Sequence, residues 1–255
     1  MADTLYLSLW YPNLRLAALG DKLIAVLGAF AGHGGEDRVY SATVWPVDWS
    51  EAPVFQRIYG RAGQGAGASA AVAEALELLH DDYAYEFQVG WDLWELEGAD
   101  DDVLPQAGGD AGPSTARAAL SASRSAQDGI SDSSAQDGRA EPSGAGVRAP
   151  TTGGPPRWVR GPRLVRVTGF GPLFDEGAYE QDGHIRIDFG SDAPFLEEDV
   201  DLERVGARHI EENVRQLLDL AAAVEKASGA TARLLWSELG ESLAQRLAER
   251  LGMSN

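Results

Sequence analysis

The first 98 residues of this chain show apolar patterns that change from strand-like to helix-like and back. Four runs rich in apolar and aromatic side chains predict strands. They are residues 5–11, 39–47, 54–59 and 83–96. Large apolar residues three or four positions apart predict helices over residues 14–30 and around Val72, Leu76 and Leu79. The resulting order, β-α-β-β-α-β, is that of a ferredoxin-like split βαβ unit.

Residues 161–255 predict a second set of elements in the order β-β-α-β-α. The expected strands are residues 163–170, 184–189 and 233–236. The clearest helix, over residues 204–227, has one apolar stripe. The stripe consists of Ile210, Val214, Leu217, Leu218, Ala221 and Val224. A final helix is predicted by Leu239, Leu243, Leu247 and Leu251. Together, the two segments predict an α+β fold with an antiparallel or mixed sheet and about four helices.

Residues 99–160 interrupt this pattern. They are dominated by Ala, Gly, Ser, Pro and Asp, and the pentapeptide SAQDG occurs twice. Such a segment buries too little apolar surface to offset the chain entropy lost on ordering, so a disordered insert is expected. The insert divides the chain into residues 1–98 and 161–255, which we expect to pack together because each is marginal in size for independent stability.

Charge narrows the range of partners. The 255 residues carry a net charge of −19, and most of the acidic surplus lies in the two segments expected to fold. An acidic surface repels phosphate backbones and anionic lipids, so neither nucleic acid nor a membrane is an expected partner. A protein with a basic surface is the natural complement.

The chain contains no cysteine. Disulfides, thiol nucleophiles and zinc–thiolate sites are therefore excluded. The sequence begins without a signal-peptide pattern and has no apolar run long enough to cross a bilayer, so a cytoplasmic protein is expected. The four histidines do not form a recognised metal-binding motif, and neither a metal nor a cofactor is predicted.

A glycine-rich loop at residues 60–67 lies between a predicted strand and a predicted helix. Backbone N–H groups at such a position can bind an anion, with Arg57 and Arg61 as charged contacts and Gly63 and Gly65 providing the close approach. The loop lacks the Lys-Ser/Thr ending of a P-loop. A simple flexible connector explains the same residues.

Tryptophan is the least ordinary component of the segments expected to fold. Trp45 and Trp49 flank a predicted strand end beside acidic residues, whereas Trp91 and Trp94 fall on opposite faces of one strand. Tryptophan is enriched at the energetic centres of protein interfaces, which makes these four residues candidate partner contacts. Filling of the core is the alternative interpretation.

No nucleophile, base and acid set can be assembled from the sequence. The leading hypothesis is therefore a non-catalytic acidic protein-binding module, such as an inhibitor, an immunity protein or an accessory subunit of a complex. One alternative is a phosphate- or nucleotide-binding enzyme that uses residues 60–67. Another is a scaffolding protein in which the insert separates two binding surfaces.

Overall fold

A single antiparallel sheet of seven strands organises the described part of the chain. The computed structural model describes residues 3–60, 64–97, 157–196 and 204–238. The strand order is β3-β2-β4-β5-β6-β1-β7, and each neighbouring pair is antiparallel. The strands are β1 (Thr4–Trp10), β2 (Gly35–Pro46), β3 (Phe55–Ile58), β4 (Tyr83–Leu96), β5 (Trp158–Phe170), β6 (Ile185–Ser191) and β7 (Ala232–Ser237).

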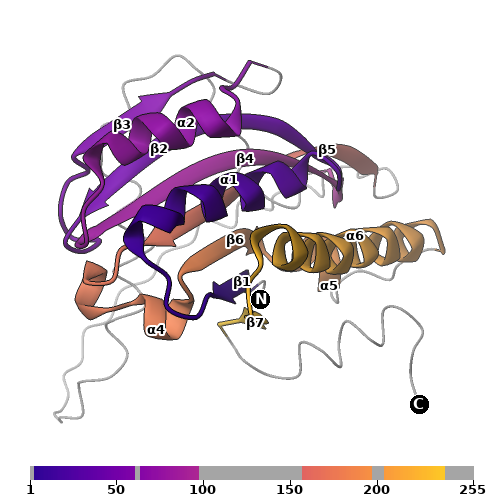
Figure 1. Ribbon diagram of the computed structural model, residues 1–255. Coiled ribbons are helices and arrows are strands. Elements are labelled where there is room, and N and C mark those ends of the chain that lie inside the picture. The colour runs from indigo at the N-terminus through magenta and orange to yellow at the C-terminus, as the bar shows by residue number, and fades with distance from the viewer. Residues whose placement is uncertain (1–2, 61–63, 98–156, 197–203, 239–255) are drawn as a thin grey trace, which may run out of the picture. The chain divides into compact units, whose positions relative to one another are not determined.

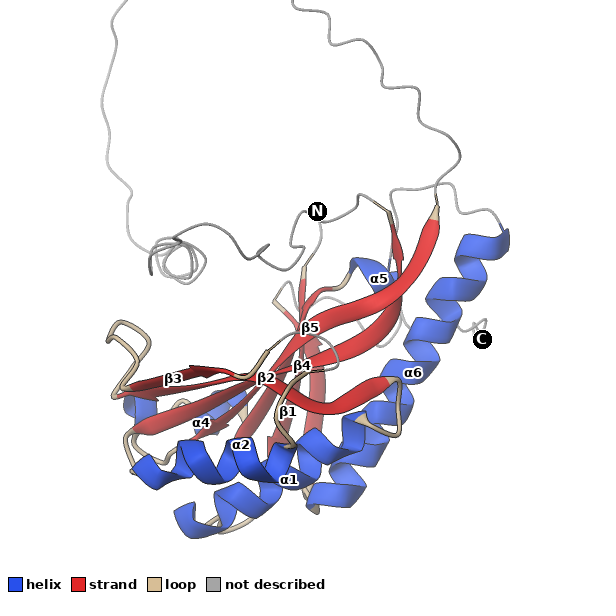
Figure 2. Cartoon of the chain, turned by 90° about the horizontal axis from the view of Figure 1, so that it is seen from above, coloured by secondary structure: helices blue, strands red, loops and turns tan. Residues whose placement is uncertain are grey.

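Three helices cover one face of this sheet: α1, α2 and α6 (Figures 1 and 2). The α-helices in the described residues are α1 (Leu19–Phe30), α2 (Ala68–Ala75), α4 (Tyr179–Asp182), α5 (Ala193–Leu196) and α6 (Arg204–Ser228). Three short 3-10 turns accompany them: η1 (Leu16–Ala18), η2 (Leu76–Leu78) and η3 (Phe174–Glu176). We call the opposite side of the sheet the helix-free face, because α1, α2 and α6 do not cover it.

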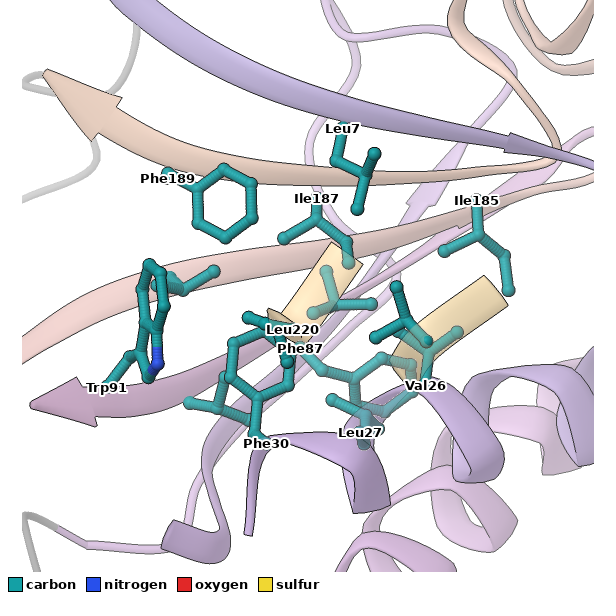
Figure 3. Close-up of a cluster of buried hydrophobic side chains, with 14 of the residues drawn as sticks. Leu7, Val26, Leu27, Phe30, Phe87, Trp91, Ile185, Ile187, Phe189 and Leu220 are labelled. Atoms are coloured by element: carbon teal, nitrogen blue, oxygen red, sulfur yellow. The ribbon is translucent and has the colours of Figure 1, made fainter. Parts of the chain in front are cut away.

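The main core lies between the sheet and these helices. Side chains alternate across a strand, so Tyr85, Phe87 and Trp91 of β4 all point to the helix side and are fully buried. Figure 3 shows how Phe87 and Trp91 meet Phe30 of α1 and Phe189 of β6. Leu218, expected in the buried stripe of α6, is instead 38% exposed.

Strands from both halves of the sequence interleave in the sheet. β1 pairs with β6 on one side and β7 on the other, so it does not pair with β2 or β4 of its own half. The α+β class and the antiparallel sheet are therefore confirmed, while the ferredoxin-like order is not, because β1 does not join the other strands of that unit. The described residues before and after the insert belong to one compact unit.

β4 and β5 form a long hairpin. Their pairing runs without a shift from Ala84 opposite Phe170 to Leu96 opposite Trp158. The Glu97 N–H continues it with a 2.8 Å hydrogen bond to the Arg157 carbonyl. β5 thus includes residues 158–160, which we had expected at the end of the insert. Residues 99–156 of that insert and the predicted final leucine-rich helix lie outside the described residues.

The last residues of β4 extend beyond the end of β2, because β2 pairs with β4 only as far as Trp91. The exposed strand edge is completed by a side chain of α6. Asn213, fully buried, accepts a hydrogen bond from the Trp94 N–H at 3.0 Å and donates to the Trp94 carbonyl at 2.8 Å and the Pro194 carbonyl at 2.9 Å. This amide satisfies backbone groups that a missing strand would otherwise have paired.

Candidate functional site

Three loops far apart in the sequence are joined by backbone hydrogen bonds at one end of the sheet. Val47 donates to the Asp82 carbonyl at 2.8 Å, and the Asp175 N–H donates to the Val47 carbonyl at 2.7 Å. A third bond, of 2.9 Å, runs from the Leu173 N–H to the Asp81 carbonyl. We call these loops the acidic loop patch. They comprise residues 46–54, 77–83 and 171–182.

The acidic loop patch contains most of the exposed apolar side chains. Nine large hydrophobic residues are exposed in the described part of the chain, and five of them belong to these loops. They are Val47, Val54, Leu78, Leu79 and Leu173. Leu173 and Val47 expose 62% and 53% of their surface, respectively. Scattered exposed apolar residues are ordinary, but a concentration of them typically marks a binding surface.

Charge in the same loops has one sign. Nine of their residues are acidic and none is Lys or Arg. The acidic residues are Asp48, Glu51, Glu77, Asp81, Asp82, Asp175, Glu176, Glu180 and Asp182. His80 adds an imidazole whose Nδ1 lies 3.6 Å from the Asp82 carboxylate. Loops that combine exposed apolar side chains with carboxylates have the composition expected for docking a basic protein surface.

The backbone of these loops is strained where they meet. Val47, Asp175 and Glu176 all have positive φ, at 56°, 44° and 56°. This conformation disfavours side chains, and for a β-branched residue such as Val47 it is a clear outlier. Gly171 is required nearby, because a Cβ atom there would lie 2.3 Å from the Asp81 carbonyl oxygen. Strain of this kind concentrates at functional sites.

Aromatic rings support the patch from the helix-free face. Trp49 packs edge-on against Trp45, Phe170 and Phe174, with ring centroids 5.8, 6.1 and 5.0 Å away. Phe170 and Phe174 belong to a second, smaller buried cluster against which both tryptophans pack. Trp45 and Trp49 remain partly exposed. Trp49 of the patch and the adjoining Trp45 therefore pack the loops against the sheet.

A single arginine connects these rings to the loops. The Arg186 guanidinium lies 6.0 Å from the Trp49 ring centroid and 5.4 Å from that of Phe170, and it pairs with Asp182. Burial raises the pKa of Asp182 above its ordinary value, an effect that the positive charge of Arg186 opposes. Arg186 is thus already engaged within the chain.

The other two predicted tryptophan contacts lie elsewhere. Trp91 is fully buried in the main core, which removes it from the candidate contact residues. Trp94 is partly exposed at the far end of β4, where it stacks on His209 of α6 at 3.9 Å. Trp94 therefore does not join Trp45 and Trp49.

The glycine-rich loop is only partly described, since Arg61 and Gly63 lie outside the described residues. Arg57 pairs with Glu74 of α2, and the Tyr59 hydroxyl donates to the same carboxylate at 2.8 Å. A Cβ atom on Gly65 would lie 2.5 Å from the Val39 carbonyl oxygen, so glycine there serves close backbone packing. Neither Arg57 nor Gly65 therefore supports the predicted anion site.

Three ionisable side chains lie close together on the helix-free face, on strands β4, β5 and β6. Arg166 of β5 pairs with Asp188 of β6 at 2.5 Å. Glu86 of β4, opposite Thr168, forms neither a hydrogen bond nor a salt bridge with the residues that the structure describes. Burial raises the pKa of Glu86, and Asp188 adds to the increase, while Arg166 opposes it. Ionised Glu86 is therefore disfavoured in the folded protein.

No family model, curated protein or solved structure matches this chain. Its function has to be inferred from its own residues. Within residues 3–60, 64–97, 157–196 and 204–238, no group of three or more His, Asp or Glu side chains is placed to hold a metal ion. None of the helices described is both long and apolar enough to span a bilayer.

The sequence indicated only part of this site. Trp45 and Trp49 were recognisable because tryptophan is enriched at the energetic centres of protein interfaces. Val47 and Leu173 were not, because their exposure depends on how loops 126 positions apart in the chain meet. The pairs Asp81-Asp82 and Asp175-Glu176, which bring acidic side chains to the meeting point, were the signal that could have found it.

Proposed function

We propose that this protein is a non-catalytic binding module that recognises a basic protein surface through the acidic loop patch. One observation carries the proposal: five of the nine exposed large apolar side chains share three hydrogen-bonded loops with nine acidic residues and no Lys or Arg. An inhibitor, an immunity protein or an accessory subunit of a complex would use such a surface.

The two components of the patch serve different parts of recognition. Val47 and Leu173 supply apolar surface that a partner would remove from water. Such buried apolar contacts provide much of the affinity of protein interfaces. The surrounding carboxylates attract a basic partner over a distance of roughly 8–10 Å at physiological salt and disfavour acidic competitors. Backbone bonds between the loops limit the ordering that binding would otherwise require.

Affinity capture from a lysate of the source organism tests this function, with captured proteins identified by mass spectrometry. The unmodified protein is expected to retain a basic protein at low salt and to release much of it at high salt. The double variant Asp81→Asn and Glu176→Gln, which removes two exposed charges from the patch, is expected to retain much less of that protein.

The matched control carries Asp21→Asn on α1 and Asp219→Asn on α6. It removes the same two charges from exposed positions of the helix layer and should capture the partner as well as the unmodified protein does. Equal losses for both double variants would mean that net charge alone attracts the partner. Capture of only acidic proteins, or of none, would contradict the proposal.

The alternatives have less support. A nucleotide-binding enzyme would need Arg57 free to meet phosphate, but Arg57 pairs with Glu74. A scaffolding role depends on the insert, of which residues 99–156 lie outside the described residues. We therefore retain both as hypotheses and give preference to the binding module.

A further inference from the structure

A cavity of about 320 Å³ opens where β1 leads into α1. Its lining combines aromatic and aliphatic side chains with the polar groups of Asn13 and His184, and it contains no Asp, Glu, Lys or Arg. The lining residues are Tyr11, Asn13, Leu14, Leu16, Leu19, Phe170, Pro172, Tyr179 and His184. Its volume falls at the lower end of the range for small-molecule sites. Pro172 and Tyr179 also belong to the acidic loop patch, so the two features adjoin each other.

His184 gives this cavity a directional polar group. The Tyr11 backbone N–H donates to His184 Nδ1 at 3.3 Å, which places the proton of the neutral ring on Nε2. No residue in the described ranges accepts a hydrogen bond from that Nε2–H group. Burial lowers the pKa of His184, so the ring is neutral at physiological pH. His184, a donor without an internal acceptor, thus lines a cavity that has no charged side chain.

Two more rings shape the space around His184. The Tyr179 ring lies 4.8 Å from the imidazole, tilted by 38°, and the Tyr11 ring lies 6.1 Å away, nearly edge-on. These distances are typical of favourable aromatic pairs. A planar group that entered the cavity could pack against the same rings. A charged group would lose hydration on entering, and none of the lining side chains carries a charge to compensate for that loss.

We propose that this cavity binds a neutral planar ring carrying one hydrogen-bond acceptor, with the acceptor facing His184 Nε2. The inference does not depend on the proposed function. The ring can belong to a free small molecule or to a side chain of a protein segment, and the chemistry of recognition is the same for both.

Benzamide is a suitable probe, and ethylbenzene, which has a ring but no acceptor, is its control. Saturable binding to the full chain at millimolar concentration is expected for benzamide, at about five-fold higher affinity than for ethylbenzene, as one hydrogen bond provides. The ligand comparison uses the unmodified protein and so remains decisive if a variant fails to fold. Absence of saturable benzamide binding, or equal affinity for the two ligands, would overturn the proposal.

Two variants locate the binding. Leu16→Trp fills the cavity and should abolish benzamide binding, while Leu218→Trp on the exposed side of α6 should leave it unchanged. His184→Phe keeps a ring but removes the donor, so it should lose the preference for benzamide. Binding that survives Leu16→Trp would show that benzamide binds elsewhere and would reject this site.

Two Lys-rich peptides distinguish the sources of the ring, one ending in phenylalanine amide and the other in alanine amide. Tighter binding of the phenylalanine peptide, reversed by benzamide, identifies a protein segment as the source. Benzamide binding without such competition identifies a free small molecule. Both results support the cavity as a ring-binding site, and failure here would leave capture by the acidic loop patch unaffected.

Discussion

The Asp175 N–H donates a 2.7 Å hydrogen bond to the Val47 carbonyl, and both residues have positive φ. Two loops from opposite halves of the sequence are therefore connected by residues whose backbones are each unfavourable in isolation. Such a pairing persists only when the surrounding structure fixes it. Here two contacts hold the loops: the Trp49 ring packs against Phe174, and the Val47 N–H donates a hydrogen bond to the Asp82 carbonyl.

Replacing Val47 by glycine should stabilise the protein. Glycine adopts positive φ without steric cost, so Val47→Gly should raise the free energy of unfolding by roughly 1 kcal/mol. Val54→Gly is the control, because Val54 is similarly exposed, at 48%, but does not have positive φ. There glycine should lower stability by about 0.5–1 kcal/mol. Urea unfolding measures both, and a decrease for both variants would show that Val47 is not strained.

Residues 98–156 should be dispensable for folding. They connect Glu97 and Arg157, whose backbones are hydrogen-bonded at the end of the β4–β5 hairpin. A two-residue Asn-Gly turn suits that geometry, and shortening a loop reduces closure entropy by about 0.6 kcal/mol for each halving. The shortened chain should be at least as stable as the full one by thermal unfolding. A large loss of stability would mean that the sheet depends on those residues.

Glu86→Gln should change how stability varies with pH. The folded-state pKa of Glu86 is raised above 4.5, so its protonated form favours folding, and this contribution is lost as pH rises through the raised pKa. The variant has no such loss and should gain stability relative to the unmodified protein between pH 4.5 and neutral pH. The exposed Glu51→Gln controls for removal of one negative charge. Parallel pH profiles for the unmodified protein and Glu86→Gln would be evidence against this assignment.

Asn213→Ala should be strongly destabilising. It removes three hydrogen bonds and leaves the buried Trp94 and Pro194 backbone groups without partners, at a cost of about 2–4 kcal/mol. Leu218→Ala, also on α6, removes a partly exposed side chain and should cost less than about 1 kcal/mol. Denaturant unfolding compares them. Similar small losses would indicate that water satisfies the end of β4 without Asn213.

Local pattern predicted the elements better than their arrangement. The alternation of Ile185, Ile187 and Phe189 and the stripe on α6 were sufficient to place β6 and α6, because burial on one face fixes the period. The arrangement was missed because Leu7 of β1 pairs with Ile187 and Leu235, and no local signal encodes partners so distant. Exposure of Leu173 depends on that same arrangement and was equally hidden.

Hydrogen exchange on the complex with the captured basic partner tests the central claim most directly, because it reports where contact occurs. Binding through the acidic loop patch should slow exchange at residues 46–54, 77–83 and 171–182, and leave α6 unchanged. Protection confined to α1 and α6, with those three loops exchanging as in the free protein, would contradict the account.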